Sequence, residues 1–252
     1  MPKTAHTPPL ADGTIPPPVI EAERLRFSWP GASSQCLQID RFALRRGERL
    51  LLLGPSGCGK STLLGLLGGV LQPSAGTVHL LGGPFSACKP SERDRLRADH
   101  IGFIFQQLNL VPYLSLEDNV LLPCQFSPLR RRRAGNDPRR AARDLLHALE
   151  LPETLWKRPV TDLSVGQQQR AAAARALIGT PELLIADEPS SALDGGNRDR
   201  LMQLLTAQLK AHEAALLVVS HDERLQPFMD RTVRMETLNA ITSVSVSDSG
   251  LD

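Results

Sequence analysis

Short apolar runs alternate with longer segments of helical periodicity along most of this 252-residue chain. The short runs are rich in Leu, Ile and Val, a composition typical of strands. They lie at residues 19–27, 37–44, 50–53, 77–81, 101–105, 183–186 and 215–220. Helical periodicity appears at residues 137–149, 167–178 and 197–212. Buried strands that alternate with helices predict an α/β fold with a parallel sheet covered on both faces.

Three segments depart from this pattern. Residues 1–18 are rich in Pro and small polar residues and cannot bury enough apolar surface to order themselves, which predicts a flexible leader. Prolines break up residues 108–128, and a helical pattern follows, so we expect a helical insertion at about 107–161. Residues 237–252 form a short, Ser-rich tail, which leaves 19–236 as one domain.

A run of four arginines, residues 130–133, lies inside the expected insertion. Two interpretations stay open at this point. The run forms a solvated loop or helix face, or it forms a patch that binds phospholipid headgroups or docks a partner.

Composition excludes several classes of protein. A net charge of +2 and an aromatic content of 4% argue against a nucleic-acid partner. No stretch approaches the roughly 20 apolar residues of a membrane span, and the N-terminus has no signal-peptide pattern, so we expect a cytoplasmic location. The four cysteines lack CxxC spacing, so neither a zinc site nor a disulfide framework is expected.

A glycine-rich loop follows the strand at residues 50–53 and fits the phosphate-loop pattern G-x-x-x-x-G-K-[ST]. Its glycines let consecutive backbone N–H groups surround the phosphates of a nucleoside triphosphate. Lys60 would reach the β- and γ-phosphates, and the Ser61 hydroxyl would ligate Mg²⁺. A turn that merely caps a helix is the alternative, disfavoured by the strand before the loop and the helical run after it. The expected nucleotide contacts are Gly54, Pro55, Ser56, Gly57, Cys58, Gly59, Lys60, Ser61 and Thr62.

Two consecutive carboxylates, Asp187 and Glu188, end the strand at residues 183–186. Ligands gather at the carboxyl ends of parallel strands, so both acids are expected to face the nucleotide. Asp187 would hold Mg²⁺, and Glu188 would activate the attacking water as general base. Without a phosphate loop in the same chain, an ordinary strand-to-turn junction would be the better interpretation.

Residues 163–170 read Leu-Ser-Val-Gly-Gln-Gln-Gln-Arg and resemble the signature sequence of ABC ATPases. Three further motifs follow the order of that family: Gln106 matches its glutamine loop, residues 191–194 its D-loop, and His221 its switch histidine. Trp29 stands where the family places an adenine-stacking aromatic, with a core tryptophan as the alternative. Val165 replaces the first glycine of the usual signature, a departure that bears on rate or dimer affinity.

The resemblance implies a P-loop NTPase core of the RecA type, with a small antiparallel β subdomain and an inserted α-helical subdomain. It also implies an ATPase that uses ATP and Mg²⁺ and dimerises head to tail, with a homodimer favoured. Gln106 would contact Mg²⁺ or the attacking water, and His221 would steady the γ-phosphoryl group. Taken alone, each would be an ordinary polar or capping residue. The remaining site residues carried over are Ser164, Gly166, Gln167 and Asp194.

The chain is similar to the lipoprotein-release and macrolide-efflux branch over residues 105–112 and 116–123. That resemblance implies a separate integral membrane permease as partner and a peripheral position on the inner face of the cell membrane. Residues 190–194, Ser-Ser-Ala-Leu-Asp, instead look like solute-importer cassettes. A compact importer ATPase therefore remains an alternative, as does, less favoured, a soluble ABC ATPase without a transport role.

Overall fold

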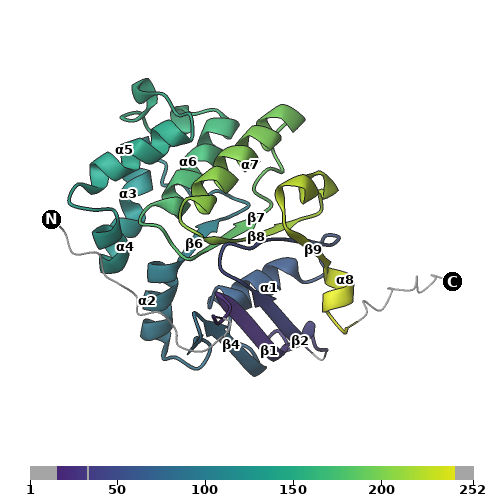
Figure 1. Cartoon of the computed structure of the whole chain (residues 1–252). Coiled ribbons are helices and arrows are strands. Elements are labelled where there is room, and N and C mark those ends of the chain that lie inside the picture. Colours follow the sequence, from purple (N-terminus) through teal and green to yellow (C-terminus); the bar gives the residue numbers. More distant parts are fainter. Residues whose placement is uncertain (1–15, 33, 242–252) are drawn as a thin grey trace.

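A parallel sheet of five strands forms the centre of the molecule (Figure 1). The structure is a computed structural model that describes residues 16–32 and 34–241, so most of the expected leader and tail lie outside the described residues. The strand order is β6-β7-β8-β3-β9. In that order the strands are Ile101–Ile104, Leu183–Asp187, Ala215–Ser220, Arg49–Leu53 and Arg231–Arg234. Because all of them run parallel, their carboxyl ends meet at one edge of the sheet.

A smaller antiparallel sheet, in the order β2-β1-β4-β5, lies beside it. Strands β1 (Ile20–Phe27) and β2 (Leu37–Leu44) pair along their full length, and β4 (Ala75–Leu80) pairs with the other edge of β1. Residues 83–84 form the very short strand β5 (Gly83–Pro84). This sheet is the small β subdomain that the sequence predicts.

Helices cover both faces of the parallel sheet (Figure 1). The helices in the described ranges are α1 (Lys60–Leu67), α2 (Pro90–His100), α3 (Leu116–Phe126), α4 (Pro128–Arg133), α5 (Pro138–Ala148), α6 (Val165–Leu177), α7 (Gly195–Lys210) and α8 (Met235–Leu238). Short 3₁₀ helices occupy Glu153–Leu155, Val160–Asp162 and Glu223–Phe228.

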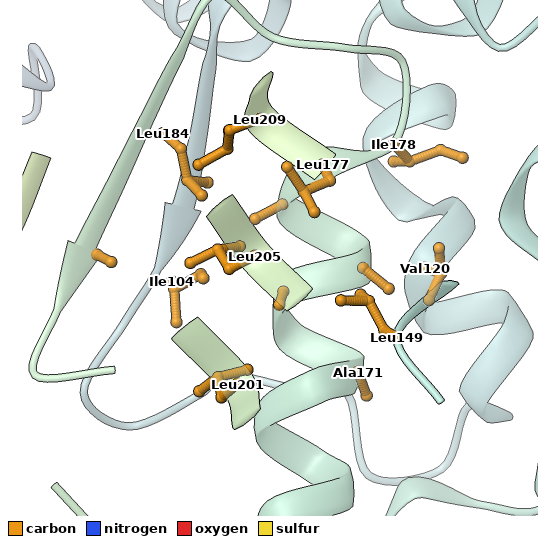
Figure 2. Close-up of a cluster of buried hydrophobic side chains, with 14 of the residues drawn as sticks. Ile104, Val120, Leu149, Ala171, Leu177, Ile178, Leu184, Leu201, Leu205 and Leu209 are labelled. Carbon is orange, nitrogen blue, oxygen red and sulfur yellow. The ribbon is translucent and has the colours of Figure 1, made fainter. Parts of the chain in front are cut away.

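Alternate residues of the central strands divide the core into two clusters. In β3, Leu51 and Leu53 face the cluster that α3, α5, α6 and α7 complete, whereas Leu50 and Leu52 face α1 and the antiparallel sheet. Figure 2 shows the first cluster, with Leu201, Leu205 and Leu209 of α7 beside the side chains of α6. This two-sided burial explains the uninterrupted apolar runs of the parallel strands.

The expectation that prolines break up residues 108–128 is wrong for Pro123, which lies inside α3. The Ser115 side chain caps the start of this helix by accepting a hydrogen bond from the Asp118 amide. Leu116, Val120 and Cys124 then form one buried face. Packing of that face against the core outweighs the cost of a proline inside a helix, about 3 kcal/mol.

The arginine run divides between two environments, so neither interpretation of it as a whole holds. Arg130 is buried, and its guanidinium donates to the carbonyl oxygens of Ala176 and Ile178 at the end of α6. Arg133 pairs with Glu182. Arg133 is nevertheless exposed, as are Arg131 and Arg132. Half of the run therefore attaches α4 to the core.

Candidate functional site

The phosphate loop connects the carboxyl end of β3 to α1, as the sequence predicts. Gly57 and Gly59 adopt φ angles of 81° and 97°, in the left-handed region that favours glycine. A Cβ atom on Gly54 would lie 2.7 Å from the Cys58 sulfur and 2.9 Å from Cβ of Met235. The loop therefore packs tightly against helix α8 at Gly54, where a larger residue would require movement, whereas a side chain at Gly57 has space but would be strained by its φ angle.

Lys60 is folded across the loop. Its Nζ donates to the carbonyl oxygens of Gly54 at 2.7 Å and Pro55 at 2.8 Å. The ammonium group is thereby fixed at the first turn of α1, where the positive end of the helix also favours an anion.

Ser61 and Asp187 meet although they are far apart in the sequence. The Ser61 hydroxyl donates to Oδ2 of Asp187 at 3.1 Å. Burial raises the pKa of Asp187, and the neighbouring Glu188 charge raises it further, while the Ser61 hydrogen bond and the Lys60 charge oppose this. A cation beside this carboxylate would stabilise its charged form.

Glu188 is held by two hydrogen-bond donors and a close histidine nitrogen. Its Oε2 accepts from the Ser220 hydroxyl at 2.8 Å, and its Oε1 accepts from the His221 amide at 3.1 Å and lies 2.8 Å from His221 Nδ1. The backbone of Glu188 has a φ of 47°, an uncommon conformation for a residue with a side chain. The carboxylate therefore has a fixed orientation at the end of β7.

Sequence reasoning missed Ser220 as a site residue. The available signal was its position directly before His221, at the end of the buried strand β8 that pairs with β7. A hydroxyl there is placed to reach the acid that ends the neighbouring strand.

A cleft of about 370 Å³ brings most of the expected residues together. Trp29, which is 46% exposed, lies at one end and makes an edge-to-face contact with Phe27, so it is not a core residue. Gly54, Pro55 and Cys58 belong to the loop without lining the cleft. The cleft lining is Trp29, Cys36, Ser56, Gly57, Gly59, Lys60, Ser61, Thr62, Gln106, Asp187, Glu188, Ser191 and His221.

Ser191 of the D-loop lines this cleft, but Ser164, Gly166, Gln167 and Asp194, which were also expected at the site, do not. Ser164 caps α6 in a capping box with Gln167, and Gly166 lies in the first turn of the same helix. Asp194 caps α7 by accepting a hydrogen bond from the Asn197 amide. One chain therefore presents a cleft and, separately, a capped helix N-terminus that carries the signature.

The donor atoms near the phosphate loop fit Mg²⁺. Ser61, Asp187 and Gln106 offer only oxygen ligands, which this hard cation prefers, and Mg²⁺ usually takes its remaining ligands from phosphates and water. Within residues 16–32 and 34–241, no group of three or more His, Cys, Asp and Glu side chains could hold a metal ion without such help.

Comparison with known proteins decides the family, since residues 37–191 match the ABC transporter family. The chain belongs to this family. Its ATPase domain makes the protein the ATP-hydrolysing subunit of an ABC transporter, and the predicted P-loop NTPase fold is confirmed. None of the helices in the described ranges is long and apolar enough to cross a membrane.

Three relatives illustrate the similarity. The "Uncharacterized ABC transporter ATP-binding protein YbbA" of Escherichia coli K12 is 41% identical over 76% of this chain and 82% of its own. The "Lipoprotein-releasing system ATP-binding protein LolD" of Novosphingobium aromaticivorans is 38% identical over 86% and 96%. The dimeric cassette MJ0796 of Methanocaldococcus jannaschii superposes with a TM-score of 0.76 at 32% identity, over 85% of this chain and 93% of that structure. A post-hydrolysis dimer of MJ0796 with ADP and Pi superposes with a TM-score of 0.74.

Proposed function

We propose that two copies of this chain bind ATP between them, head to tail, and that hydrolysis separates them. The observation that carries the proposal is the division within one chain: the cleft holds the phosphate loop, Glu188 and His221, while the signature lies outside it. The first turn of α6 offers backbone N–H groups and the Ser164 hydroxyl, which suit a phosphate. Val165 in this turn is 51% exposed, so the turn is open to a second copy.

Within the cleft, each side chain has a role that its position supports. Trp29 stacks on the adenine, and Lys60 neutralises the β- and γ-phosphates. Ser61, Asp187 and Gln106 would hold Mg²⁺, which when bound neutralises charge on the phosphates. Glu188 orients the attacking water and accepts its proton, and His221 steadies the γ-phosphoryl group.

The transporter that this ATPase serves is proposed to be of the lipoprotein-release or macrolide-efflux type. The similarity to LolD over nearly the whole of that relative supports this choice, together with residues 105–112 and 116–123. The ATPase would then lie in the cytoplasm, on the inner face of the cell membrane, and dock on a separate permease. The Ser190–Asp194 stretch favours the alternative of a compact importer, which the second experiment below distinguishes.

The dimer is tested with the Glu188→Gln variant, which keeps the shape of the side chain but cannot accept the proton. In saturating ATP and Mg²⁺ it should be a stable dimer by light scattering, whereas the unsubstituted protein should dimerise only transiently. Lys60→Ala is the control, since it should remain a monomer that neither binds nor hydrolyses ATP. A Glu188→Gln variant that binds ATP but stays monomeric would refute the composite site.

The membrane partner is tested by purifying Glu188→Gln with ATP from native membranes in mild detergent. A permease with four spans and a large periplasmic domain would support the release or efflux branch. A compact permease with many spans would favour import, and recovery of ribosomes or DNA alone would refute a transport role.

A further inference from the structure

The segment between β6 and α3 connects the nucleotide cleft to the inserted helices, and few backbone hydrogen bonds hold it in place. Gln106, near its start, lines the cleft. Outside the regular elements, no backbone-to-backbone hydrogen bond joins residues 106–110 to the rest of the described chain. The next anchor is Val111, whose amide and carbonyl both bond to the Asn119 side chain in α3. Leu110 packs against the core, and the segment otherwise depends on side-chain hydrogen bonds from elsewhere.

Arg175, in the last turn of α6, supplies that support. Its Nη1 donates to the carbonyl oxygen of Asn109 and its Nη2 to that of Leu108, each at 2.6 Å. Asn109 has a φ of 50°, which turns the chain so that two successive carbonyl oxygens reach one guanidinium group. The planar fork of arginine matches such a pair, while the single ammonium of lysine does not.

The two carbonyl oxygens are the main partners of the Arg175 guanidinium group. Burial lowers the pKa of Arg175, and within the described ranges it makes no ion pair with a carboxylate. A half-buried charged group that loses its hydrogen-bonding carbonyl oxygens raises the free energy of the folded protein. Breaking the contact would therefore disturb both α6 and the Gln106 segment.

We propose that Arg175 is a positioning residue for Gln106. It binds the segment that follows Gln106 to the C-terminal end of α6. Because Ser164 caps the N-terminal end of the same helix, α6 and Arg175 connect Gln106 to the signature. The inference rests on the proposed contact of Gln106 with Mg²⁺ or the attacking water. It predicts that the contribution of Gln106 to turnover depends on Arg175.

Arg130 provides a matched control. Like Arg175, it donates to two backbone carbonyl oxygens, but its acceptors are Ala176 and Ile178 at the C-terminal end of α6, and its side chain is buried. It makes no hydrogen bond to the Gln106 segment. Substitution of Arg130 should therefore weaken the end of α6 without affecting Gln106.

The test is a double-mutant cycle on kcat and on the KM for ATP, with Gln106→Ala, Arg175→Lys and both together. We expect each single change to lower kcat about tenfold with little change in KM, and the double variant to be no slower than the slower single one. In the parallel cycle, Arg130→Lys and Gln106→Ala should act independently. Hydrogen exchange should become faster at residues 106–110 in Arg175→Lys and stay unchanged there in Arg130→Lys.

The outcomes separate this inference from the proposed function. If Gln106→Ala lowers kcat but its effect multiplies with that of Arg175→Lys, the positioning role is refuted and the role of Gln106 stands. If Gln106→Ala leaves kcat unchanged, the proposed role of Gln106 fails and the inference fails with it. Unchanged exchange at residues 106–110 in Arg175→Lys would also overturn it.

Discussion

The Ser220 hydroxyl fixes one oxygen of the proposed general base, so Ser220→Ala should slow hydrolysis without weakening nucleotide binding. Ser220 is 2% exposed and donates to Glu188 at 2.8 Å, but it does not line the cleft. A hydrogen bond to a charged group contributes about 1.5–3 kcal/mol. If this hydrogen bond stabilises the transition state by orienting Glu188, its removal should decrease kcat about 10- to 100-fold.

The assay is steady-state hydrolysis with kcat and KM measured separately, beside ATP affinity by titration. Ser220→Thr is the control, because it keeps a hydroxyl at the same position and should retain most of the activity. It also preserves an acceptor for the Asp222 amide, which bonds to the same oxygen. An alanine variant with unchanged kcat, or one impaired only in KM, would refute the reasoning.

Two further predictions concern stability. Burial raises the pKa of Glu182, but hydrogen bonds and charges from His100 and Arg133 outweigh this and lower it from 4.5 to about 2. The charged form thus contributes stability above pH 4.5 that is lost as the pH falls toward 2. Glu182→Gln should lower the unfolding free energy at pH 7 by about 2 kcal/mol after discounting for solvent screening. In urea titrations, this difference from the unsubstituted protein should shrink on acidification, and a constant difference would contradict the assignment. Leu205→Ala, in the fully buried cluster of Figure 2, should cost about 3 kcal/mol, against less than about 0.5 for the exposed control Val70→Ala. Equal costs at the two positions would count against this view of the core.

The strands and the centre of the cleft could be predicted from local sequence because buried parallel strands have a simple composition. The glycine-rich loop and the Asp187-Glu188 pair each follow such a strand, and parallel topology brings strand ends together. Ser61 and Asp187 are in contact for this reason, because each lies near the carboxyl end of a parallel strand. Whether each residue performs its expected role stays a prediction for the experiments above.

Other features depend on tertiary contacts that no local pattern contains. Helix α3 tolerates Pro123 because its buried face packs against the core. Arg130 is buried, unlike the other arginines of its run, because it donates to two carbonyl oxygens at the end of α6. The hydrogen bond from Ser220 to Glu188 joins residues that are adjacent only after β7 and β8 pair. Such effects appear once distant elements are in place.

The position of β3 has a consequence for how the protein is made. This strand, which leads into the phosphate loop, is flanked by β8 and β9, and both of its neighbours come from the C-terminal part of the chain. On a ribosome that adds 5–20 residues per second, β3 waits about 10 to 30 s for these partners. During that time neither edge of β3 has its strand partner, and the loop has no rigid base. The nascent chain therefore acquires its nucleotide site among the last steps of folding, although the loop itself is synthesised early.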